Sequence, residues 1–96
     1  MTVHIDQGVG EQALDFLARL GAHPAVAFYE HGVAFAITSI LGQLGLSYRN
    51  DQYGNIIVRI LGKGPNTVPL ALVAHMDHPG FEAISVQGEC LVAVAL

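Results

Sequence analysis

Apolar residues in the first half of the chain recur at the spacing of α-helices. Between Gly10 and Leu20 they lie one, three and three residues apart (13, 14, 17 and 20), and Gly21 is a suitable helix end. A second apolar stripe runs through Val33, Ile37, Ile40 and Leu44. The spacing predicts one helix over 10–20 and a longer one over 27–44, ended by Gly45.

The second half of the chain has a pattern typical of β-strands. β-branched residues follow a turn-rich stretch at 50–55, in which Gly54 allows a positive φ, and this predicts a hairpin. An exposed loop is expected over 62–66, and strands are expected over 81–86 and from Cys90 onward, joined by a turn at Gln87-Gly88. The continuous apolar run 70–74 predicts a strand that is buried on both faces inside a sheet. The expected fold class is α/β, with two helices followed by a mixed sheet.

The apolar run ends in His75-Met76-Asp77, which is the strongest candidate in the chain for a catalytic or metal-binding site. On an extended backbone His75 and Asp77 point to the same side, with Cβ atoms roughly 6.5–7 Å apart. Such a carboxylate can accept a hydrogen bond from an imidazole whose other nitrogen binds a metal. The alternative is an ordinary histidine at a strand end and an aspartate that begins a turn. His78 is open to three interpretations: a second ligand, a general base or a plain loop histidine.

Composition limits the classes of function. The chain of 96 residues is 52% hydrophobic and 12% charged, whereas a small domain usually carries about a quarter charged residues. We therefore expect much of its surface to be covered, and we expect the chain to be the N-terminal piece of a longer protein.

A net charge of −4 argues against nucleic-acid binding, and the single Cys90 excludes an internal disulfide. No signal peptide or apolar membrane span is visible, which predicts a cytoplasmic protein. His4, His23 and His31 have no partners at ligand spacing and are expected to be surface or structural residues.

Several of these features occur together in one family. The chain resembles the N-terminal part of the dinuclear-zinc aminopeptidases of the glutamyl and tetrahedral aminopeptidase type, some of which are labelled endoglucanase-like. The resemblance covers about residues 10–88 and departs from the family at His78-Pro79, where Glu-Ile is usual. The residues that carry it are Pro24, Glu30, the helix end 41–45, Asp51-x-x-Gly54-Asn55 and the stretch 74–81, Ala-His-Met-Asp-x-x-Gly-Phe.

The resemblance implies a three-layer α/β/α catalytic domain over 1–88 and the start of an inserted β domain over 89–96. It implies that His75 is a metal ligand. It also implies that Asp77 belongs to the catalytic site, where its carboxylate orients the His75 ring. The family hydrolyses N-terminal residues from peptides with two zinc ions, for which Co²⁺ or Mn²⁺ could substitute, and a glutamate general base. The remaining ligands are expected beyond Leu96, so the 96-residue chain alone is expected to be inactive, and the complete protein to be a homo-oligomer. The alternatives are a related metal-dependent deacylase or carboxypeptidase, and a non-catalytic scaffold with the same fold.

Overall fold

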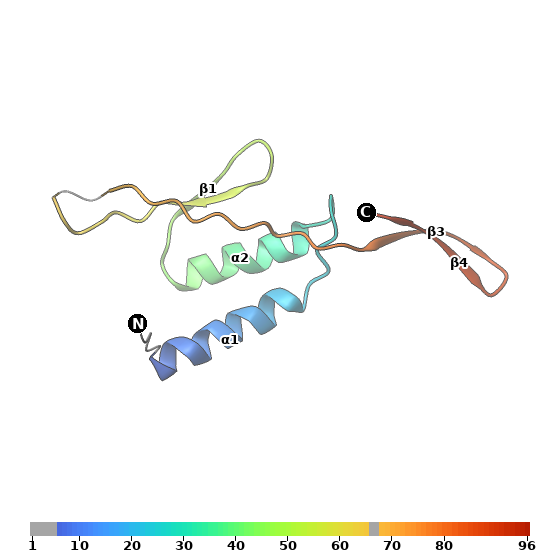
Figure 1. Cartoon of the computed structure of the whole chain (residues 1–96), viewed down its shortest axis with the longest axis horizontal. Coiled ribbons are helices and arrows are strands. Elements are labelled where there is room, and N and C mark those ends of the chain that lie inside the picture. Colours follow the sequence, from blue (N-terminus) through green and yellow to red (C-terminus); the bar gives the residue numbers. More distant parts are fainter. Residues whose placement is uncertain (1–5, 66–67) are drawn as a thin grey trace.

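The computed structural model describes residues 6–65 and 68–96, and within these ranges it contains two helices and two separate hairpins. Figure 1 shows the helices side by side, the first hairpin beside α2, and the second hairpin extending from one end of the molecule. The chain order is α1 (Gln7–Gly21), α2 (His31–Gln43), β1 (Tyr48–Asn50), β2 (Ile56–Val58), β3 (Phe81–Gln87) and β4 (Cys90–Ala95). The protein is therefore a mixed α+β chain.

Helix α1 begins three residues earlier than the apolar spacing predicts. The Asp6 side chain accepts hydrogen bonds from the backbone N–H groups of Gly8 at 2.8 Å and Val9 at 3.3 Å. These bonds satisfy donors that have no partner within the first turn, so Asp6 fixes the start of the helix. Because the cap lies before the apolar stripe, the stripe alone could not locate it.

Helix α2 begins four residues later than predicted. Phe28 has φ of 72°, which a right-handed helix does not accommodate, and the preceding Ala25 and Val26 lie in extended backbone paired with His78. The predicted helix end is confirmed. Gly45 adopts φ of 68°, and the N–H of the following Leu46 donates to the Leu41 carbonyl at 2.9 Å.

Both hairpins are antiparallel. Strands β1 and β2 pair with Arg49 opposite Ile57, and Gly54 takes φ of 85° in the turn, which confirms the predicted hairpin. Strands β3 and β4 pair from Phe81–Ala95 to Gln87–Cys90, with an irregularity between Ala83 and Ser85, and Gly88 takes φ of 62° in their turn. The expected domain boundary between residues 88 and 89 falls at this turn.

The apolar run at 70–74 is not a strand in the structure, and the prediction of a single layered α/β sheet is wrong for the described residues. The run is extended, but the part of the chain that the structure describes gives its backbone no strand partner, and Leu72 and Val73 are 90% and 93% exposed. A strand needs a neighbour to satisfy its N–H and C=O groups, and the two hairpins pair only within themselves. The loop predicted at 62–66 is exposed over 62–65, with bends at Lys63 and Gly64 and a turn at Pro65, and Asn66 lies outside the described residues.

The buried core is small and lies on α2 and the segment before it. Among the described residues, the buried ones are Ala25, Val33, Ala36 and Ile40. The radius of gyration is 18.2 Å, whereas a closed domain of about 100 residues has roughly 13 Å. Large apolar side chains of β3, β4 and the 68–74 segment therefore face solvent.

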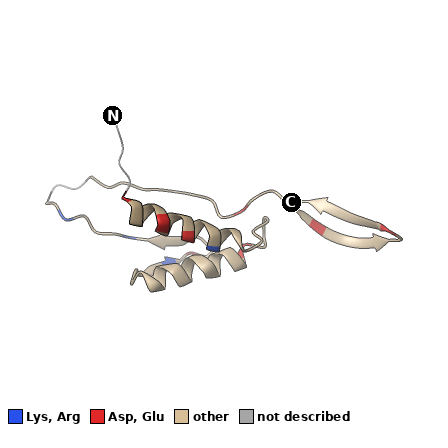
Figure 2. Ribbon diagram, turned by 90° about the horizontal axis from the view of Figure 1, so that it is seen from below, with Lys and Arg blue, Asp and Glu red and all other residues tan. Residues whose placement is uncertain are grey.

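Charged groups are sparse and dispersed. Figure 2 shows the positions of the basic residues spread singly along the ribbon, and those of the acidic residues on α1, on the second hairpin and in the connecting segments. Neither α1 nor α2, the helices within the described ranges, is long and apolar enough to cross a bilayer.

Candidate functional site

His75 and Asp77 contact each other at the end of the extended segment. The imidazole Nδ1 lies 3.2 Å from Asp77 Oδ1 and 2.8 Å from the Asp77 backbone oxygen. Met76 separates the two residues on an extended backbone, so their side chains return to the same side, as the spacing predicts. The structure thus brings together the two residues that the sequence analysis selected.

The hydrogen-bond partners of His75 determine its tautomer. Both oxygens near Nδ1 are acceptors, so Nδ1 carries the hydrogen and donates it. In the neutral ring, Nε2 then holds a free lone pair, which is the arrangement of a histidine ready to bind a metal. The His75 side chain is 83% exposed and that of Asp77 is 45% exposed, so a ligand can approach this nitrogen from solvent.

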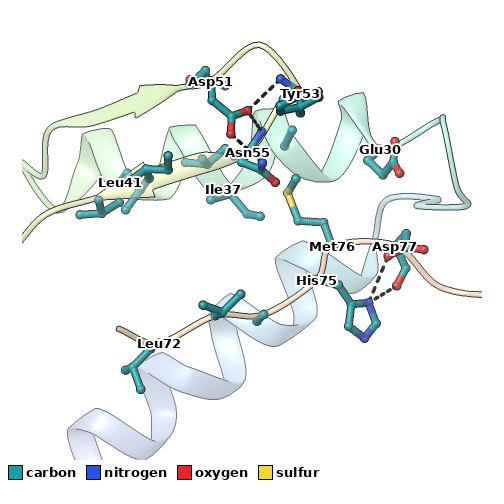
Figure 3. A pocket seen from close by; sticks show the side chains of 18 of the residues that line it. Glu30, Ile37, Leu41, Asp51, Tyr53, Asn55, Leu72, His75, Met76 and Asp77 are labelled. Carbon is teal, nitrogen blue, oxygen red and sulfur yellow. Dashed lines mark hydrogen bonds and ion pairs between the residues drawn. The ribbon is translucent and has the colours of Figure 1, made fainter. Parts of the chain in front are cut away.

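A groove with a volume of about 1000 Å³ lies between α2, the first hairpin and the extended segment. Figure 3 shows Met76 reaching toward Asn55 across this groove, whereas the His75 ring points away from the Asp51 turn. The His75–Asp77 pair and the Asp51 turn thus both line the groove, but the His75 ring does not face Asp51. Glu30 and His31 contribute to the wall at the N-terminal end of α2.

Asp51 closes the turn of the first hairpin. Its Oδ1 accepts the backbone N–H groups of Tyr53 and Asn55, both at 2.9 Å, and its Oδ2 accepts the Asn55 amide at 2.7 Å. The Asn55 side-chain hydrogen bond is the main reason that the pKa of Asp51 lies below its ordinary value. All these partners belong to the turn itself, so the role of Asp51 in stabilising the turn is sufficient to explain its presence at this position.

His78 is held against the connection between the two helices. Its backbone N–H donates to the Ala25 carbonyl at 2.8 Å, and its ring Nε2 accepts the Ala25 N–H at 3.2 Å. The other ring nitrogen, Nδ1, lies 3.0 Å from the Pro79 carbonyl and donates to it. Both ring nitrogens have partners within the chain, so this conformation leaves neither one open for a metal or for proton transfer.

Two hydrogen-bonded pairs on the helix connection have no signal in the sequence. The Tyr29 hydroxyl donates to Glu82 Oε1 at 2.7 Å, and this hydrogen bond is the main cause of the raised pKa of Tyr29. Ala25 and His78, like Tyr29 and Glu82, are 53 residues apart, and no local pattern marks either pair.

A complete metal site is not formed by the described residues. No three histidine, cysteine, aspartate or glutamate side chains gather there in a metal-binding group, whereas a catalytic zinc takes about three protein ligands. His75 fits the role of one ligand and Asp77 the role of its orienting partner. His31, at the start of α2, lines the same groove as His75 and Asp77, whereas His23 lies on the helix connection and His4 lies outside the described residues.

Comparisons of the chain with protein-family models, with curated proteins and with solved structures found no match.

Proposed function

We propose that this chain is part of a metal-dependent aminopeptidase and that it supplies one metal ligand, His75, to the active site. The observation that carries the proposal is the hydrogen bonding of His75, whose Nδ1 faces two Asp77 oxygens while its side chain is 83% exposed. That geometry leaves Nε2 free for a metal. The family resemblance around residues 74–81 adds the reaction class, peptide hydrolysis from the N-terminus.

Within this proposal Asp77 has two effects on His75. Its oxygens hold the proton on Nδ1, and its negative charge makes Nε2 a better electron-pair donor. A bound divalent metal would supply Lewis-acid polarisation of the scissile carbonyl and an activated water. Because the described residues contain one ligand, the remaining ligands and the general base would come from elsewhere in the complete protein, and the 96-residue chain alone would not hydrolyse peptides.

We also propose that the run 70–74 becomes a strand of a layered α/β/α sheet in the complete catalytic domain. Its side chains are apolar on both faces, and Leu70, Leu72 and Val73 are each more than four-fifths exposed. A strand with apolar residues on both faces is typical of the inside of a parallel or mixed sheet. Such pairing would place His75 at the strand end, where open α/β sheets bind their ligands.

The test is made on the protein expressed from its complete gene. We expect His75→Ala to lose most of the bound zinc and most of the turnover of an aminoacyl substrate, measured by metal analysis and by product release. Asp77→Asn should weaken metal binding by about 10- to 100-fold, the usual effect of removing such a partner. His23→Ala is the matched control, because His23 does not line the groove that contains His75 and Asp77, and its ring makes no hydrogen bond within the described ranges. Full metal occupancy and wild-type turnover in His75→Ala would disprove the role of His75. Zinc binding without turnover in the wild-type protein would favour the scaffold alternative.

A further inference from the structure

The contact between His78 and Ala25 combines two hydrogen bonds of opposite direction. The His78 backbone donates to the Ala25 carbonyl, and the His78 ring accepts from the Ala25 N–H. Ala25 is 3% exposed, the lowest value in the core of the described residues. Both backbone polar groups of a buried residue are thus satisfied by a single histidine 53 positions away.

The approach of the two backbones is close at this point. Val26 and His78 form a parallel bridge, and a Cβ atom added at Gly80 would overlap the Val26 side chain. The Tyr29–Glu82 hydrogen bond joins the same two segments nearby. Residues 25–29 and 78–82 therefore form one joint, which we call the His78 joint, between the helical part and the segment that leads into β3.

The ring can accept from Ala25 only while Nε2 is unprotonated. A second proton on the imidazole would place an N–H group against the N–H of Ala25, so the bond would be lost and two donors would face each other. Histidine is the side chain that changes charge between pH 5 and 8. The buried Ala25 N–H has no other acceptor in the described part of the chain, so loss of the ring bond leaves it unsatisfied.

We propose that the His78 joint is an acid-sensitive device that is closed when His78 is neutral and opens when its ring is protonated. The inference goes beyond the proposed function, because it concerns the conformation of the chain and needs no metal. Opening removes the ring hydrogen bond, one of the bonds that hold the segment carrying His75 and Asp77 to the helix connection.

Other ionisable groups surround the joint without bonding the His78 ring. His23, Tyr29 and Glu30 lie on the helix connection, and His75, Asp77 and Glu82 lie on the facing segment and β3. Within residues 6–65 and 68–96, none of these side chains is a hydrogen-bond or ion-pair partner of the His78 ring, whose partners are the backbone groups of Ala25 and Pro79.

The experiment follows the Ala25 amide by NMR in the ¹⁵N-labelled protein. Between pH 8 and pH 5 we expect its exchange protection factor, corrected for intrinsic exchange, to fall about tenfold, which corresponds to one lost hydrogen bond. In His78→Gln, whose amide oxygen can still accept but does not titrate, the change should stay below about twofold. His31→Gln is the control and should keep the wild-type response.

Three results would overturn the proposal. These are an Ala25 protection factor that does not change with pH in the wild type, an equal fall in His78→Gln, and abolition of the fall by His31→Gln. A separate measurement needs no variant: the ring ¹⁵N shifts of His78 at pH 8 should show the hydrogen on Nδ1. Finding it on Nε2 would overturn the proposal, even if His78→Gln does not fold.

Discussion

Replacing Gly80 by alanine tests whether the two segments of the His78 joint are in close contact. An added Cβ would overlap the Val26 side chain and lie 3.1 Å from its Cβ. The backbone on either side cannot move away freely, because His78 donates to Ala25 at 2.8 Å and the Gly80 carbonyl accepts from Leu96 at 2.9 Å. Overpacking of this kind costs about 1–3 kcal/mol, so we expect Gly80→Ala to lower the free energy of unfolding by about 2 kcal/mol.

Gly10→Ala is the matched control, because it adds the same methyl group where there is room for it. Gly10 lies inside α1, and no heavy atom counted beyond the helix's own backbone would come within 4 Å of the new Cβ. Alanine in a helix interior is favoured over glycine by about 0.5–1 kcal/mol. We therefore expect the two substitutions to change stability in opposite directions.

Urea unfolding followed by circular dichroism measures both variants. The midpoint should fall for Gly80→Ala and rise for Gly10→Ala, with the slope unchanged, since a changed slope would indicate altered compactness. A Gly80→Ala protein as stable as the wild type, beside a stabilised Gly10→Ala protein, would refute the close approach of Gly80 to Val26. The His78 joint would then not exist in solution.

Two further predictions concern the first hairpin and the exposed apolar segment. The hydrogen bonds of Asp51 should stabilise the turn fully above the ordinary aspartate pKa of about 3.9 and should be lost as the pH falls through the lowered value. The Tyr53 and Asn55 amide shifts should report this loss, and Asp51→Ala should show the open turn at every pH. Leu72→Ser should change the free energy of unfolding by less than about 0.5 kcal/mol, because Leu72 is 90% exposed. Since exposed apolar side chains favour association, we expect the wild-type chain to self-associate and Leu72→Ser to reduce this association, as measured by sedimentation. A loss of several kcal/mol would show that Leu72 is buried, and a monomeric wild type at all concentrations would contradict the association.

Local rules explain which elements could be predicted from the sequence. The end of α2 depends on Gly45, and the turn of the first hairpin depends on Asp51 and Gly54, each within a few residues of its partners. The contact between His75 and Asp77 is equally local, since two residues on an extended backbone have little freedom to separate. The order of the elements, two helices before the strands of the hairpins, followed from apolar spacing and turn residues alone.

Long-range pairing explains the errors. The start of α2 was misplaced because Val26 pairs with His78 and Phe28 takes a positive φ, and neither is visible in the helical pattern of 27–44. The role of His78 could not be chosen from the sequence for the same reason. Its partner, Ala25, is an unremarkable small residue 53 positions earlier.

The apolar run 70–74 shows why an apolar pattern alone did not predict the structure of this segment. Apolar side chains on both faces indicate that the run is suited to burial, but they do not say which strands would cover it, and the described hairpins leave Leu72 and Val73 exposed. His75 directly follows this run in the chain. The surroundings of its side chain therefore depend on the His78 joint and on any strand that pairs with the run. The joint fixes the segment from one end through bonds that the chain itself supplies. If His75 is a metal ligand, as proposed, further ligands would meet its Nε2, the ring nitrogen that Asp77 leaves free, and the described residues do not supply them.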